Sequence, residues 1–87
     1  MNIYVGNLDF KVDEKDLEGV FDEYGAVSSA KVIMDKFTGR SKGFGFVEME
    51  NQNEANKAIQ ELDGATFENR KITVNEAKPR KKSYSNY

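Results

Sequence analysis

Residues 42–49, with the sequence KGFGFVEM, place a lysine and two phenylalanines on alternate positions of one stretch. Exposed aromatic rings on a strand stack on nucleic-acid bases, and a lysine beside them neutralises phosphate. A second stretch, residues 3–8 with the sequence IYVGNL, places Tyr4 among aliphatic residues in the same alternation. These residue types therefore favour stacking on bases, provided that the fold brings the two stretches together and leaves their rings exposed.

The composition of the 87 residues argues against several other kinds of chemistry. The chain has no Cys and no His, so it lacks the residues for disulfides, thiolate nucleophiles, thiolate zinc sites and the usual general base. We therefore expect no enzymatic activity, no cofactor and no metal site. No apolar run approaches the roughly 20 residues that span a bilayer, so we expect a cytoplasmic protein without membrane contact.

The net charge of −2 is an average over two unlike regions. All 15 acidic residues lie in residues 1–77 beside nine Lys or Arg, which leaves that region at −6, whereas residues 78–87 hold four cations. Seven of the acidic residues fall between Asp9 and Glu23. A surface for nucleic acid must lie away from this acidic segment. We expect one domain over residues 1–77 and a basic, disordered tail over residues 78–87.

Two segments have the apolar spacing of amphipathic helices. The first is expected at about residues 13–24, with Asp13 as its N-terminal cap and Gly25 at its end. The second is expected at about residues 52–63, opened by Asn51 with Glu54 three positions later. The residues of these helices expected to face the core are Leu17, Val20, Phe21, Tyr24, Ala55, Ala58, Ile59 and Leu62.

Four strands are expected around these helices. They cover residues 3–8, 27–34, 42–50 and 71–76. A loop at residues 35–41 joins the second strand to the third, and a short extended segment at residues 66–67 precedes the last. The order β-α-β-β-α-β predicts an α+β fold of the ferredoxin-like sandwich class, in which a four-stranded antiparallel sheet carries both helices on one face.

Alternation along the strands predicts which face of the sheet packs against the helices. One set of alternate positions is aliphatic in every strand and comprises Ile3, Val5, Ala30, Val32, Val47, Met49, Ile72 and Val74. Phe44 and Phe46 belong to the opposite set, together with Lys42 and Glu48. Burying that set would bury two charges at a cost of several kcal/mol per unpaired ion. We therefore expect both phenylalanines to face solvent, and Gly43 and Gly45 to allow close approach of helix or strand backbone on the inner side.

Residues 42–49 and 3–8 resemble the octapeptide and hexapeptide motifs of the RNA recognition motif. The one departure in the octapeptide is Met49, where Phe or Tyr is usual. Its inward position leaves the outer surface of the sheet unchanged. The chain as a whole is similar to the small one-domain RNA-binding proteins of bacteria. The resemblance implies the strand order 4-1-3-2 and the non-catalytic binding of single-stranded RNA.

The resemblance also implies roles for individual residues. Tyr4 and Phe46 would each stack on a base, Phe44 would lie against a ribose or between two sugars, and Lys42 would meet a phosphate. The other residues expected at the RNA surface are Lys31, Ile33, Arg40, Lys71, Thr73, Asn75 and Lys78. Base stacking on two or three rings predicts roughly micromolar affinity for a few nucleotides. Post-transcriptional regulation and RNA chaperoning are the roles expected of such a protein.

Other readings of the same residues stay open at this point. A protein-interaction module on this fold would use the acidic first helix to hold a basic partner, and fold alone never fixes function. Single-stranded DNA is a further candidate ligand, because stacking tolerates deoxyribose. We expect a monomer. Phe37, in the loop at residues 35–41, is expected to pack locally in preference to contacting a nucleotide.

Overall fold

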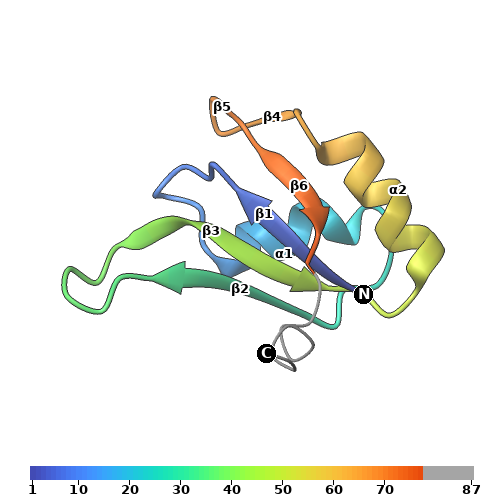
Figure 1. Ribbon diagram of the computed structural model, residues 1–87, viewed down its shortest axis with the longest axis horizontal. Helices are drawn as coiled ribbons and strands as arrows, with labels where there is room; N and C mark the ends of the chain where they lie inside the picture. The colour runs from blue at the N-terminus through green and yellow to red at the C-terminus, as the bar shows by residue number, and fades with distance from the viewer. Residues whose placement is uncertain (78–87) are drawn as a thin grey trace, which may run out of the picture.

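The computed structural model describes residues 1–77, which form a four-stranded antiparallel sheet with two helices on one side of it (Figure 1). The sheet order is β2-β3-β1-β6, with strands β1 (Asn2–Gly6), β2 (Ser29–Met34), β3 (Ser41–Glu48) and β6 (Thr73–Glu76). The helices are α1 (Glu14–Asp22) and α2 (Gln52–Leu62), and a small second sheet pairs β4 (Thr66–Phe67) with β5 (Arg70–Lys71). The ferredoxin-like class and the order 4-1-3-2, counted over the strands of the larger sheet, are confirmed.

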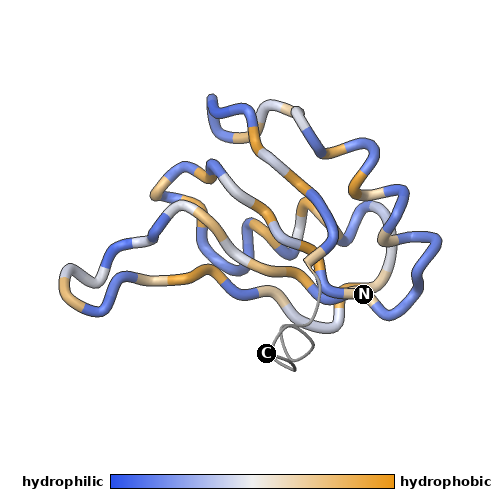
Figure 2. Tube along the Cα trace, in the orientation of Figure 1, coloured by the Kyte–Doolittle hydropathy of each residue, from blue (hydrophilic) through white to orange (hydrophobic). Residues whose placement is uncertain are grey.

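The helix-facing side of the sheet is aliphatic, as the alternation predicts. The buried members of the expected set are Ile3, Val5, Val32, Val47, Met49, Ile72 and Val74, and Ala30 packs against them partly buried. From the helices, the core takes Leu17, Phe21, Ala55, Ala58 and Leu62. Val20, Tyr24 and Ile59, also expected in the core, lie at its margin and are only partly buried. Figure 2 shows the hydrophobic residues concentrated in the sheet strands, with hydrophilic residues at the tip between β4 and β5.

Side-chain caps begin both helices where the sequence predicts. The Asp13 carboxylate accepts from the backbone N–H of Asp16, and the Asp16 carboxylate accepts from that of Asp13, which makes a full capping box. Asn51 accepts from the backbone N–H of Glu54 at 2.9 Å. The first helix ends at Asp22, two residues earlier than predicted, because the Tyr24 N–H bonds the Phe21 carbonyl in a tighter turn. Neither helix is long and apolar enough to cross a membrane.

The last strand differs from its prediction. Residues 71–76 were expected as one strand, but Lys71 belongs to β5, and the larger sheet gains only Thr73–Glu76. The reason lies at Ile72, whose N–H donates to the Ala65 carbonyl and whose carbonyl accepts from the Gly64 N–H. These two bonds hold Ile72 against the segment that follows α2, so the strand breaks there. The second strand starts at Ser29, later than predicted, and the third ends at Glu48.

At each edge of the sheet, a carboxylate from the end of a helix accepts a hydrogen bond from one backbone N–H of the edge strand. The Val32 N–H of β2 donates to Glu14 Oε2 at 3.1 Å, and Glu14 is the first residue of α1. The Val74 N–H of β6 donates to Asp63 Oδ1 at 3.0 Å, and Asp63 caps the end of α2. Each helix therefore holds an edge of the sheet through a side chain as well as through the core.

Gly45 is a point of close contact between β3 and β2. A Cβ atom placed on it would collide with the Lys31 carbonyl oxygen and lie 3.2 Å from Val32 Cα and 3.3 Å from Leu17 Cδ2. Two of these three neighbours are backbone atoms, which cannot rotate away. The expectation of close approach on the inner side is confirmed at Gly45 but wrong at Gly43, where the nearest atom to an added Cβ would lie at an ordinary contact distance of 3.5 Å.

We predict that Gly45→Ala lowers the free energy of unfolding by about 1–3 kcal/mol, because the added methyl group forces β2 and β3 apart. Gly19→Ala is the control, because a Cβ at Gly19 meets no atom within 4 Å, and alanine is favoured over glycine in a helix by roughly 1 kcal/mol. Urea denaturation of both variants measures the difference. A Gly45→Ala protein as stable as the wild type would contradict the close packing described here.

Candidate nucleic-acid interface

Three aromatic rings form a cluster on the sheet face opposite the helices. Tyr4 of β1 lies with its ring centroid 5.9 Å from that of Phe44 and 5.9 Å from that of Phe46, both on β3. Phe44 and Phe46 are 6.1 Å apart, with their rings perpendicular. These separations lie within the range of favourable aromatic pairs. The two stretches that the sequence singles out are therefore adjacent, and their rings touch.

The cluster faces solvent but is not fully exposed. Phe46 has 37% of its surface exposed, whereas Tyr4 and Phe44 are half-buried. The rings cover one another's edges, so part of their apolar surface is removed from water. Three isolated exposed rings would not gain this stabilisation. The prediction that Phe44 and Phe46 face solvent is correct, and the mutual contact explains how so small a protein maintains three aromatic residues there.

A row of four residues crosses the sheet through this cluster. The strand register pairs Lys31 with Phe46, Phe46 with Tyr4, and Tyr4 with Asn75, so the row takes one residue from each strand. With neighbouring strands about 4.8 Å apart, the row is roughly 14 Å wide. It places a cation at the β2 edge, two rings in the middle and an amide at the β6 edge.

The other residues expected at the surface lie around this row. Thr73 is exposed beside Gly6 on the next row, and Ile33 is half-buried on β2. Lys42 is exposed on β3, and Arg40 is exposed in the loop that precedes it. Lys71 is exposed, but it pairs with Thr66 in the small sheet and not with a strand of the larger one. Lys78 lies outside the described residues.

Gly6 is a part of this surface that the sequence analysis did not single out. It shares the face of Tyr4, and a Cβ placed on it would lie 2.5 Å from the Tyr4 hydroxyl oxygen and 2.9 Å from two ring carbons. The Tyr4 ring therefore lies along β1, over Gly6. The sequence pattern that could have pointed to Gly6 is a glycine two positions after an exposed aromatic residue on a strand, because such a glycine lies beside the ring on the same face.

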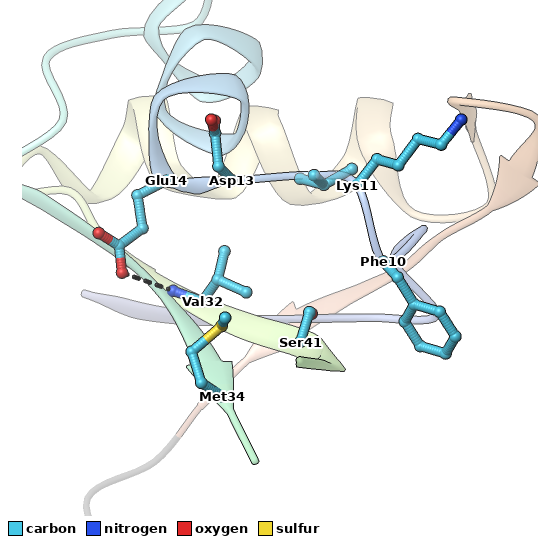
Figure 3. A pocket seen from close by; sticks show the side chains of 8 residues that line it. Phe10, Lys11, Asp13, Glu14, Val32, Met34 and Ser41 are labelled. Carbon is cyan, nitrogen blue, oxygen red and sulfur yellow. Dashed lines mark hydrogen bonds between the residues drawn. The ribbon is translucent and has the colours of Figure 1, made fainter. Parts of the chain in front are cut away.

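A hollow of about 380 Å³ lies elsewhere, on the helix side of the sheet near the β2 edge (Figure 3). Its apolar lining includes Phe10, Val32 and Met34, and Glu14, which also lines it, accepts a hydrogen bond from the Val32 N–H. Val32 and Met34 have the inward parity of β2, opposite to Lys31 and the aromatic rings. The hollow is therefore separate from the aromatic cluster.

Comparison with known proteins agrees with this geometry. The family model described as the RNA recognition motif matches residues 3–73. The chain belongs to the RNA recognition motif family. Both aromatic stretches lie within the matched residues, and so do the strands β2 to β5 and all of β1 after Asn2, whereas β6 is matched only at Thr73.

Two curated relatives and one solved structure show how far the similarity extends. The putative RNA-binding protein RbpA of Synechocystis is 52% identical over 92% of this chain and 79% of its own length. The chloroplastic RNA-binding protein CP31B of Arabidopsis thaliana is 55% identical over 90% of this chain, which spans only 27% of that protein. The crystal structure of RNA Binding Protein PG1 superposes with a TM-score of 0.89 at 59% identity, covering 92% of this chain and 96% of that one.

In this RNA recognition motif, a side-chain clamp joins the end of β1 to the small sheet. Asn7 has a left-handed backbone with φ 59°, and its side-chain N–H donates to the Lys71 carbonyl at 2.6 Å. The Arg70 guanidinium donates to the Asn7 side-chain oxygen at 2.8 Å and to its backbone carbonyl at 3.3 Å. The clamp fixes Lys71 and Arg70 beside the end of the sheet. Sequence analysis missed it, because a contact over 63 residues has no local pattern.

We predict that Gly6→Ala turns the Tyr4 ring away from β1 and weakens its contact with Phe44 and Phe46, while the protein stays folded. The reason is that the methyl group would occupy the space of the Tyr4 hydroxyl. Nuclear Overhauser contacts between the three rings measure the change. Asn2→Ala is the matched control, because Asn2 lies on the same strand and face, two positions before Tyr4. Unchanged ring contacts in Gly6→Ala would refute the role assigned to Gly6.

Proposed function

We propose that this protein binds single-stranded RNA on the sheet face opposite the helices, by aromatic stacking and phosphate contacts, without catalysis. The observation that carries the proposal is the partly exposed cluster of Tyr4, Phe44 and Phe46. Lys31 and Asn75 flank two of its rings, Phe46 and Tyr4, in one row across the sheet. Family membership supports RNA as the ligand.

Each ring has a distinct task in this proposal. Tyr4 and Phe46 lie directly opposite each other on adjacent strands, and each stacks on one base. Phe44 lies 5.9 Å from Tyr4, with its ring inclined 34° to it, and packs against the ribose between the stacked bases. Asn75, opposite Tyr4 on β6, offers an amide to the edge of a base. Thr73 and Ile33 border the same strand of RNA.

Charge along β3 orients the phosphates. Lys42 stands at the beginning of this strand and Glu48 at its end, both exposed on the outer face. Arg40 precedes Lys42, and Lys31 lies opposite Phe46 on β2. The phosphate backbone therefore runs nearer the Arg40 and Lys42 end, away from Glu48. Lys71, fixed beside β1 by the Asn7 clamp, and Lys78 supply further cations.

Several broader features belong to the same proposal. Stacking on two or three rings gives roughly micromolar affinity, which suits a protein that binds and releases many transcripts. We infer a monomer that acts in the cytoplasm as a post-transcriptional regulator or RNA chaperone. Because Phe44 is proposed to pack against a ribose, the 2′-hydroxyl, which DNA lacks, lies at this site and favours RNA over DNA.

We predict that Tyr4→Ala and Phe46→Ala each weaken binding of a short single-stranded RNA by roughly 5- to 150-fold, which corresponds to about 1–3 kcal/mol for each stacked base. Fluorescence anisotropy measures the affinity, and amide NMR spectra report folding. Phe10→Ala is the control, because Phe10 is 66% exposed but lines the hollow on the helix side. If Phe10→Ala weakens binding and the sheet variants do not, RNA binds on the helix side instead.

We also predict that the logarithm of the affinity falls with the logarithm of the salt concentration with a slope of roughly −2. Neutralising about three phosphates of a single strand produces this slope, at about 0.7 for each. Lys42→Gln, which removes one phosphate contact, is expected to make the slope shallower by about 0.7. A slope near zero would contradict the phosphate contacts proposed for these cations.

A further inference from the structure

Phe37 is the most exposed large hydrophobic residue among those that the structure describes. It lies between β2 and β3 with 95% of its surface in solvent. The expectation that it packs locally is therefore wrong, because a ring this exposed packs on nothing. Burial would be worth about 1.5–3 kcal/mol to a residue of this size. Its exposure suggests a use outside the fold.

Asp35 makes several hydrogen bonds within the loop that carries Phe37. The Asp35 carboxylate accepts from the backbone N–H of Phe37 at 2.8 Å and from that of Thr38 at 3.3 Å. The Asp35 backbone bonds Gly39 and Arg40, at 2.8 and 2.7 Å, which closes the loop. The Phe37 backbone is therefore fixed before any ligand arrives, so binding to it has a smaller entropic cost.

Cations accompany the ring. Lys36 and Arg40 are both exposed in the same loop, whereas the nearby carboxylate of Asp35 is turned inward to the loop's own N–H groups. An exposed ring with cations on either side suits a stacked base and its phosphates. Figure 2 shows hydrophobic colouring at the tip of this loop, between hydrophilic residues.

The loop lies in line with the aromatic cluster. Figure 1 shows the β2 and β3 hairpin projecting beyond the other strands of the sheet. Asp35 is four residues beyond Lys31, which places the loop about 13 Å from the row through Phe46 and Tyr4. Lys42 lies on β3 between the row and the loop, and Arg40 lies in the loop itself, so the proposed phosphate path leads from the sheet to the loop.

We propose that Phe37 is a further stacking site, which takes a base of the same RNA strand after that strand leaves the sheet. The inference rests on the proposed function and extends it to a longer ligand. A strand of about four nucleotides covers only the sheet, whereas one of about ten nucleotides reaches the loop as well. Phe37 therefore makes the affinity depend on RNA length.

The test compares Phe37→Ala with the wild type on mixed-sequence single-stranded RNAs of about four and about ten nucleotides. We expect the variant to bind the longer RNA at least roughly fivefold more weakly and the shorter RNA equally well. Phe37→Trp keeps a stacking ring and is expected to bind the longer RNA as the wild type does. Phe10→Ala removes an exposed aromatic ring on the helix side of the sheet and is expected to change neither affinity.

The possible outcomes separate this inference from the proposed function. If Phe37→Ala binds both RNAs as the wild type does, while Phe46→Ala still weakens both, the sheet binds RNA and the loop site is refuted. If Phe37→Ala weakens both lengths equally, Phe37 acts on the sheet and is not a separate site. If the wild type binds neither RNA, the proposed function fails and the loop site fails with it.

Discussion

The alternation of side chains along the four strands of the larger sheet determines both the stability of this protein and its binding surface. Because successive residues point to opposite faces, Val47 can be buried under the helices only if Phe46 points outward. The same holds for Val5 and Tyr4 on β1. A shift of one residue in the pairing of β1 and β3 would exchange the two faces, burying the rings and exposing the aliphatic core. Core packing therefore protects the position of the rings.

Most of the fold could be predicted from the sequence because its patterns are local. Asp13 and Asn51 precede amphipathic spacing and do cap the helices. The aliphatic set that includes Ile3 and Val74 is buried, and Phe46 lies outward. Strand order required the family resemblance, since alternation shows which face a residue occupies but not which strand lies next to it. The RNA contacts assigned to individual residues remain predictions.

Two features that the sequence did not reveal depend on contacts between distant segments, and a third lies in the loop between β2 and β3. The break in the last strand depends on hydrogen bonds between Ile72 and residues 64–65, which compete with continued pairing to β1. The clamp between Asn7 and Arg70 joins residues far apart in the chain, and neither has a distinctive neighbourhood in the sequence. Phe37 was expected to pack locally, but the hairpin leaves 95% of its surface exposed.

The two edge carboxylates described above have a consequence for how the protein meets other proteins. An exposed edge strand is a template on which a strand of another molecule can pair, which leads to β-augmentation and to aggregation. Glu14 accepts from one backbone N–H at the edge of β2, and Asp63 accepts from one at the edge of β6. An incoming strand would have to displace a charged acceptor at either edge. Each edge therefore has one N–H group that is already bonded to a carboxylate, which opposes the pairing of a further strand there.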